Sequence, residues 1–328
     1  MSKFSDLGNA LYSGDRSIDF VGRRKLWYTV AAIVVGLAVL IPTLRGGFQF
    51  GIEFRGGSEF RVTAVSKQGT DIALRAVQKV VPNAEPIITI VGSDANGNND
   101  IRIQTLRLDS TKAEQIHQNL DAGYKVPYSA VSSSFIGASW GGDVTSKALS
   151  GLLWFVLLAA IMLAAYFRTV KMSAAAIAAL IHDIVVTAGI YGAFGFEVTP
   201  AAVIGFLTIL GYSLYDTVVV FDKIRENTFE VEFSETATFA ERVNLAINQT
   251  LVRSINTSVV AVLPVASILF IGALFLGAGT LKDISLALFI GIIVGTYSTI
   301  FIAAPLYSQL REGEPKYRKA ADRVLASR

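Results

Sequence analysis

The sequence predicts a polytopic α-helical membrane protein, with six transmembrane helices and a ferredoxin-like (βαββαβ) α+β domain between helices 1 and 2. Three observations support this fold class. Hydrophobic residues make up 52% of the 328 residues and charged residues only 17%, whereas soluble domains have about 45–50% and about 25%. Several apolar runs reach the roughly 20 residues that a bilayer-spanning helix needs. The segment between the first two runs instead has the periodicity of a soluble domain.

The spans are placed by the apolar runs and oriented by the basic residues beside them. Segment 1–25 is polar and ends in Arg23–Lys25, against a first span at 26–44. Such a long polar start is not typical of a cleavable signal. Basic segments stay on the cytoplasmic side, so segment 1–25 and the basic tail 311–328 predict two cytoplasmic termini. The other spans fall within residues 144–310 and are expected at 145–167, 173–194, 199–221, 255–276 and 284–306.

Residues 45–143 are expected to form a domain outside the cytoplasm. Its predicted elements, in the order βαββαβ, are a strand at 59–65, a helix at 71–81, strands at 86–92 and 101–106, a helix at 110–120 and a strand at 129–136. The turn-rich stretch Ser93–Asn99 connects the two middle strands. Ser110 or Thr111 is expected to cap the second helix, with Glu114 completing a capping box. The lone His117 is interpreted as a packing or solvated residue.

The cytoplasmic segment 222–254 contains an apolar stripe at helical spacing, from Phe239 to Leu251. This pattern predicts an amphipathic helix over about 237–251. Such a helix lies on the membrane surface or packs under the bundle, and the sequence alone does not separate these two positions.

Composition excludes several classes of function. The chain has no Cys, so disulfides, thiolate-bound metals and thiol nucleophiles are excluded. There is no phosphate-binding Walker sequence, and no clustered set of metal-ligating residues is apparent. The net charge of +3 is explained by the basic residues beside the spans, so no nucleic-acid partner is expected. The chain is therefore predicted to be no enzyme and to bind no cofactor.

Asp216 is the first candidate functional residue. It lies inside the fourth predicted span, where an ionised carboxylate costs about 2.5–3.5 kcal/mol on insertion scales. Its side chain is therefore expected to face the bundle interior, a cation or a water path. The alternative is that it only joins helices by hydrogen bonding.

Arg253 is the second candidate, because it begins the fifth span at about the depth of Asp216. An Asp216–Arg253 ion pair would make both charges tolerable and would supply a protonation switch. The alternative for Arg253 is that its side chain reaches the lipid headgroups.

A second set of polar residues extends the candidate site. His182 and Asp183 lie near the middle of the third span and form either a proton relay or a local polar pair. The other members of the possible relay are Ser213, Thr217 and Asn256. Two aspartates on neighbouring spans, Asp183 and Asp216, superficially suggest an aspartyl intramembrane protease, but the Gly-x-Gly-Asp motif of that class is absent.

Two long motifs, Gly211–Asn227 and Asn248–Ser258, resemble the fourth span and the entrance of the fifth span in the SecD/SecF family of protein-export membrane proteins. His182-Asp183, Gly51–Gly57 and Leu286–Pro305 are also similar. The likeness runs from the first span to the end of the sixth. The chain departs from the family pattern at Glu53, where Asp is usual, and at Tyr215, where Asn is usual.

This resemblance implies membership of the resistance–nodulation–division superfamily, whose transporters have two six-span halves. It implies a SecD partner that supplies the other half, the SecY translocon complex, a translocating preprotein and the lipids of the bacterial cytoplasmic (inner) membrane. The energy source it implies is the proton gradient. By the same resemblance, Asp216 matches the proton-handling aspartate and Arg253 its counter-charge. A proton-coupled small-molecule or lipid exporter of the same superfamily is the alternative function.

Overall fold

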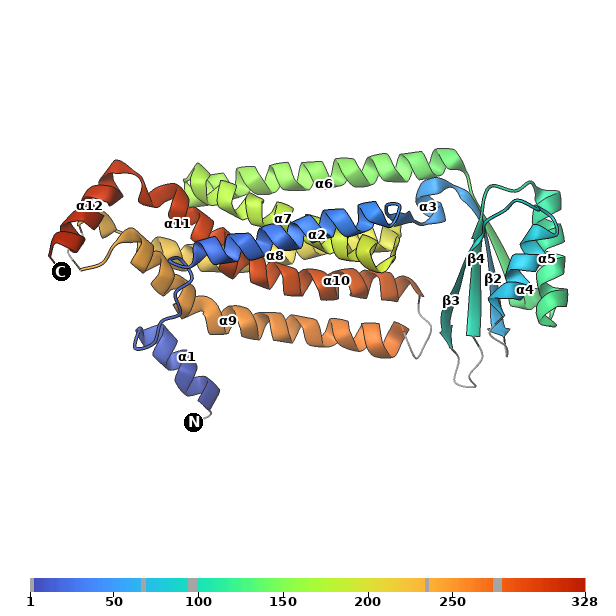
Figure 1. The fold of residues 1–328 in the computed structure, drawn as a ribbon, viewed down its shortest axis with the longest axis horizontal. Coiled ribbons are helices and arrows are strands. Elements are labelled where there is room, and N and C mark those ends of the chain that lie inside the picture. The colour runs from blue at the N-terminus through green and yellow to red at the C-terminus, as the bar shows by residue number, and fades with distance from the viewer. Residues whose placement is uncertain (1–2, 66–68, 94–98, 234–235, 274–278, 328) are drawn as a thin grey trace.

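The computed structural model describes residues 3–65, 69–93, 99–233, 236–273 and 279–327. A long helical bundle carries a small domain with a sheet at one end (Figure 1). In the described part of the chain, six helices are long and apolar enough to cross a membrane. The predicted fold class is therefore confirmed.

The bundle consists of α2 (Arg24–Leu44), α6 (Ala138–Phe167), α7 (Val170–Phe194), α8 (Pro200–Asn227), α9 (Phe239–Ser267) and α10 (Gly279–Ser298). α9 continues into a π-helical turn, Ile268–Ala273. α10 passes through a second π-helical turn, Thr299–Ala303, into α11 (Ala304–Glu312). A 3₁₀ turn, Val231–Phe233, and a tail helix, α12 (Pro315–Ala326), complete the end of the bundle opposite the sheet.

α9 differs from its prediction, because the expected amphipathic helix and the fifth span form one continuous helix. Thr238 begins it with a capping box: its hydroxyl accepts from the Glu241 amide, and the Glu241 carboxylate accepts from the Thr238 amide. Neither Gly nor Pro occurs between Phe239 and Leu263, so nothing in the sequence ends the helix at the membrane boundary.

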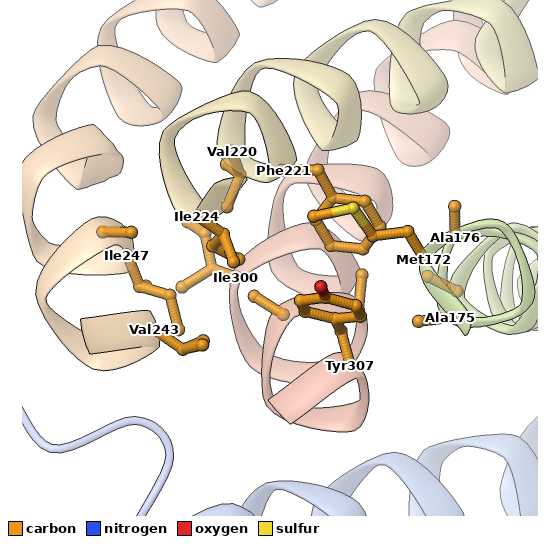
Figure 2. Packing of buried hydrophobic residues seen from close by; sticks show 14 of the residues in the cluster. Met172, Ala175, Ala176, Val220, Phe221, Ile224, Val243, Ile247, Ile300 and Tyr307 are labelled. Carbon is orange, nitrogen blue, oxygen red and sulfur yellow. The ribbon is translucent and has the colours of Figure 1, made fainter. Parts of the chain in front are cut away.

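The first turns of α9 pack under the bundle, which decides between the two predicted positions. Val243 and Ile247 are fully buried against Ile224 of α8 (Figure 2). Tyr307 of α11 lies in the same cluster. This stretch therefore covers the end of α8 and does not rest on a lipid surface.

Glycines allow α8 and α10 to approach closely. A methyl group on Gly205 of α8 would lie 2.6 Å from Cβ of Ala287 and 3.1 Å from the carbonyl oxygen of Ile284, both on α10. Further along, a methyl group on Gly295 would lie 3.1 Å from Ser213. Such contacts between backbones are typical of small residues in membrane helices. Gly211 differs, since no described atom lies within 4 Å of its missing methyl position.

The polar N-terminal segment contains a helix, α1 (Lys3–Ser13), that the sequence did not predict, and then a stretch held by α9. We call residues 17–21 the N-terminal strap. The amide oxygen of Asn248 accepts from the Ile18 backbone at 2.8 Å, and that of Asn244 accepts from the Phe20 backbone at 2.8 Å. Both amide nitrogens donate to the Ile18 carbonyl. The two asparagines are one turn apart, so they present their amides on one face of α9.

The outer domain has the predicted order of elements: β2 (Gly57–Val65), α4 (Thr70–Gln78), β3 (Ile87–Ser93), β4 (Asn99–Thr105), α5 (Ser110–Tyr124) and β5 (Val131–Ile136), with a 3₁₀ turn at Tyr128–Ala130. Its antiparallel sheet has the strand order β3-β4-β2-β5. In the register, Phe60 lies opposite Ile103 on one side and Ser133 on the other. The predicted connection between β3 and β4 falls largely on residues 94–98, which lie outside the described residues.

The two faces of the sheet differ, as strand alternation requires. Phe60, Val62, Ile101 and Ile103 are fully buried under α4 and α5, which cover the face away from the bundle (Figure 1). His117 is buried in α5, where its ring stacks on Tyr128 at 3.9 Å. This packing agrees with the interpretation made from the sequence.

The predicted cap of α5 is wrong in detail. Asp109 is the N-cap, and its side chain accepts from the Lys112 amide at 2.8 Å. Glu114 instead accepts hydrogen bonds from Gln118 and Tyr128. Asp is as effective a cap as Ser, so the helix begins at Ser110 with the cap one residue earlier than expected.

Short elements connect the two parts of the molecule. After α2, β1 (Gln49–Phe50) pairs in parallel with β6 (Glu197–Val198), the turn between α7 and α8. The one-turn helix α3 (Ile52–Arg55) then leads into β2. The sheet domain is thus attached at a point where the ends of α2, α7 and α8 meet.

Candidate functional site

Asp216 is buried in the middle of the bundle, with only 4% of its surface exposed. Its Oδ1 accepts a hydrogen bond from the Ser254 hydroxyl of α9 at 2.9 Å. Its Oδ2 is also buried and has no hydrogen-bond partner among the described residues. The side chain therefore faces the bundle interior, as predicted.

Arg253 does not form the expected ion pair with Asp216 in the described structure. It precedes Ser254 on α9, which confirms that Arg253 and Asp216 lie at similar depth. Successive residues on a helix point about 100° apart, so the side chain that reaches Asp216 belongs to Ser254 while Arg253 is exposed. Within this chain, a neutral hydroxyl takes the place predicted for the guanidinium.

His182 and Asp183 form a buried pair on α7. Nδ1 of His182 lies 3.2 Å from Oδ1 of Asp183, and Oδ2 of Asp183 accepts from the Ser213 hydroxyl at 2.6 Å. Nε2 of His182 is buried without a hydrogen-bond partner in the described residues. The predicted relay residues His182, Asp183 and Ser213 therefore form one connected group.

Hydroxyl pairs extend the polar interior from α8 and α9 to α10 and the π-helical turn that follows it. Thr217 lies 2.9 Å from Thr299, which begins the second π-helical turn. Ser258 lies 2.5 Å from Thr296, and Tyr212 donates to Ser258 at 3.4 Å. π-helical turns occur frequently at functional sites.

Ser213, Asp216 and Thr217 are related by three- and four-residue steps, so they share one face of α8. This face points at α7, at α9 and at the π-helical turn after α10, through the three contacts described above. The interior of the bundle thus holds two carboxyl groups, each bound by a serine from a different helix. Because Asp183 and Asp216 bind different serines, the structure gives no support to a proton-sharing aspartyl dyad.

One predicted relay residue lies elsewhere, and several contributors were missed. Asn256 is exposed on α9 and makes no hydrogen bond that the described residues show. Ser254, Thr296 and Thr299 were not proposed, although each is buried or half-buried and bonded to the polar interior. The four-residue spacing of Ser254 and Ser258 is a sequence signal that places them on the same face of α9.

This arrangement suits the binding and release of a proton. An ionised carboxylate has about four acceptor positions, and Asp216 finds one donor in the described residues. A protonated carboxyl group brings its own donor and needs fewer partners in an apolar interior. The neighbouring hydroxyls both donate and accept, so they can rearrange when the charge changes.

A family model described as "Protein export membrane protein SecD/SecF, C-terminal" matches residues 116–313, more than half of the chain. The chain belongs to the SecD/SecF family. The match includes the five spans after the outer domain and every residue of the polar interior described above.

Individual relatives agree with this family membership. The chain is 44% identical to the protein translocase subunit SecF of Streptomyces coelicolor, over 100% of this chain and 86% of the relative. It is 30% identical to the protein translocase subunit SecDF of Thermus thermophilus, over 89% of this chain and 38% of that relative. The crystal structure of a Thermus SecDF, described as a translocon-associated membrane protein, superposes with a TM-score of 0.78 at 27% identity, covering 91% of this chain and 39% of that one.

These comparisons establish the general role of this SecD/SecF family member. It is a bacterial membrane protein that acts as an accessory subunit of protein translocation in the Sec pathway. The family names favour this role over the small-molecule or lipid exporter considered from the sequence.

Proposed function

We propose that the chain drives a late step of preprotein export with the proton motive force, and that Asp216 is its proton-coupling residue. The main support is the burial of a carboxyl group that has a single donor in the described residues, between helices α8 and α9. The proton gradient then serves as the energy source, without a cofactor.

In this proposal, protonation of Asp216 weakens its bond to Ser254 and lets α8 and α9 shift against each other. His182, Asp183 and Ser213 form a second polar group that exchanges protons with the same interior. Arg253 stays in the proposal as a counter-charge, but it acts from the exposed side of α9 and not as a direct partner of Asp216.

A SecD partner is proposed to supply the second half of the assembly. In the Thermus relative the region that matches this chain is 38% of a longer SecDF chain, which supports such an arrangement. Arg253 and Asn256, two polar residues exposed on α9, then face the partner and not lipid. The complete assembly acts beside the SecY translocon complex on an emerging preprotein, in the lipids of the bacterial inner membrane, with both termini of this chain in the cytoplasm.

The proposal is tested by following preprotein export into vesicles after ATP is exhausted, with the chain assembled with its SecD partner. Asp216→Asn keeps the shape of the side chain but removes the titratable group, so the gradient-dependent step is expected to disappear. Asp222→Asn makes the same change six residues further along α8, where Asp222 accepts from Tyr166 at 3.0 Å. This control is expected to export like the wild type. Gradient-dependent export by a normally assembled Asp216→Asn protein would exclude Asp216 as the coupling residue.

A further inference from the structure

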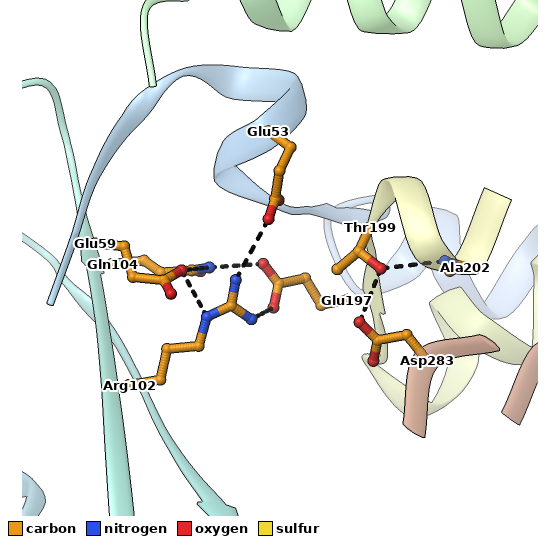
Figure 3. Close-up of polar contacts among 8 residues, drawn as sticks. All are labelled: Glu53, Glu59, Arg102, Gln104, Glu197, Thr199, Ala202 and Asp283. Carbon is orange, nitrogen blue, oxygen red and sulfur yellow. Dashed lines mark hydrogen bonds and ion pairs between the residues drawn. The ribbon is translucent and has the colours of Figure 1, made fainter. Parts of the chain in front are cut away.

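A cluster of partly buried charges connects the outer domain with the bundle. We call Glu53, Glu59, Arg102, Gln104 and Glu197 the outer joint (Figure 3). Arg102 and Gln104 come from β4 and Glu59 from β2, whereas Glu197 belongs to the turn between α7 and α8. The sheet residues lie on the face opposite the apolar core of the domain.

Arg102 is the centre of the outer joint. Its Nε lies 2.7 Å from Glu59, and its Nη1 lies 2.6 Å from Glu197. Gln104 donates to the same two carboxylates, at 3.2 Å to Glu59 and 2.8 Å to Glu197. Glu59 therefore fixes the guanidinium from within the domain, and Glu197 binds it from the bundle.

The outer joint is shielded from water, so its ion pairs contribute more than pairs on an open surface. The side chains of Arg102, Glu59 and Glu197 are 18%, 20% and 21% exposed. Burial alone would lower the pKa of the Arg102 guanidinium, but the carboxylates of Glu197 and Glu59 more than compensate and raise it. Charge-assisted bonds of this kind are shorter and stronger than neutral ones, whereas fully exposed ion pairs contribute little.

Glu197 is two residues before Thr199, the N-cap of α8. The Thr199 hydroxyl accepts from the Ala202 amide at 3.2 Å and donates to Asp283 of α10 at 2.8 Å (Figure 3). Glu197 is therefore anchored to the first turn of the helix that carries Asp216. At 1.5 Å per residue, about 24 Å of continuous helix separates Pro200 from Asp216.

A cavity of about 660 Å³ lies beside the outer joint, between the sheet and the end of the bundle. Arg102, Gln104, Glu197 and Asp283 line it together with apolar residues such as Ile87 and Leu286. The sheet face is therefore held to the turn before α8 by polar contacts at the edge of an open space. When α8 tilts, this polar contact can move the sheet with it, and no apolar interface between the two has to break first.

We propose that Arg102 and Glu197 are positioning residues that transmit movement of α8 to the outer domain during translocation. This inference rests on the proposed function, in which Asp216 moves α8. It assigns a specific ion pair to the connection between the proton-handling helix and the domain outside the membrane.

The test measures the position of the domain and export separately. Because the chain has no cysteine, cysteines introduced at Gln115 of α5 and Leu281 of α10, which are both exposed, can each carry a spin label. The distance between the two labels is then measured in the assembled complex. Glu197→Arg and Arg102→Glu are each expected to broaden the distance distribution and to lower gradient-dependent export by about tenfold or more, because each replaces a partly buried ion pair by two like charges. The double charge swap restores an opposite-charge pair across the joint and is expected to recover both readouts in part, because Glu59 then faces a carboxylate at position 102.

Arg61→Glu is the matched control, because Arg61 lines the same cavity but pairs with Asp100 inside the domain at 2.7 Å. It is expected to leave the distance distribution unchanged. If Glu197→Arg does not assemble, Glu197→Gln removes the charge with the same shape and is expected to broaden the distances to a smaller degree. Wild-type distances and export in the single variants, or no rescue by the swap, would overturn the inference. An Asp216→Asn protein that exports normally would overturn the proposed function while the distance test of the joint still stands.

Discussion

At the scale of single residues, the polar interior depends on which of two neighbours on α9, Arg253 or Ser254, points toward Asp216. The sequence placed Asp216, Asp183, His182 and Ser213 in the bundle because polar residues in an apolar run must find partners. It did not separate Arg253 from Ser254, since neither charge nor composition fixes the rotation of α9. That rotation is set by tertiary packing of Val243 and Ile247 at its start, which single-sequence periodicity does not describe.

Ser254→Ala is predicted to affect coupling more than stability. It removes the only hydrogen bond that the Asp216 side chain makes in the described structure, and such bonds inside membrane bundles contribute about 0.6 kcal/mol on average. The unfolding midpoint should change little, while the gradient-dependent export step slows. Ser267→Ala, on the same helix but exposed, serves as control in both assays. Ser254→Thr keeps a hydroxyl and is expected to retain export, so equal loss in the Thr and Ala variants would contradict this role.

At the scale of elements, most boundaries followed from local signals. The six apolar runs and the βαββαβ order were predictable because period, length and turn residues agreed. The continuity of α9 was not predictable in this way, because a charged cytoplasmic stretch and an apolar span differ in composition and so predict two elements, although no helix breaker lies between them. The cap of α5 was misplaced by one residue for a simpler reason, since Asp109, Ser110 and Thr111 are all acceptable caps.

The contact between α8 and α10 gives a prediction at this scale. Gly205→Ala places a methyl group against Ala287 and the α10 backbone, and overpacking of this kind costs about 1–3 kcal/mol. The unfolding temperature of the chain purified in detergent should fall. Gly211→Ala lies on the same helix, where no described atom is within 4 Å, and should keep or slightly raise that temperature, because Ala is a better helix former than Gly. Equal effects at the two positions would show that the close approach is not limiting.

At the scale of the whole molecule, the outer domain is attached to the bundle through the outer joint, and the charge of this cluster depends on pH. Burial raises the pKa of the Glu53 carboxyl above its ordinary value of 4.5, Glu197 and Glu59 add to this effect, and Arg102 opposes it. The Glu53 carboxyl therefore keeps its proton to a higher pH in the folded state than in the unfolded chain. The resulting stabilisation is complete below 4.5 and is lost as the pH rises through the raised value.

Glu53→Gln should remove this contribution to the pH dependence. The unfolding midpoint of the wild type is expected to fall relative to that of the variant as the pH rises from about 4.5 toward neutrality. Thermal unfolding of both proteins over that range, with Glu85→Gln as a control at an exposed position of the same domain, is the measurement. Parallel curves for wild type and Glu53→Gln would show that Glu53 titrates alike in the folded and unfolded chains.

The N-terminal strap also sets an order of events in biosynthesis. Phe20 and its partner Asn244 are 224 residues apart in the chain, which takes roughly ten to forty-five seconds to synthesise at about 5–20 residues per second. During that interval the strap leaves the ribosome without the two asparagines that will hold it, and four spans follow it into the membrane. Only a chain extended through Asn248 can bind its own N-terminal strap, so docking of the strap reports that the first turns of α9, directly before the fifth span, have been made.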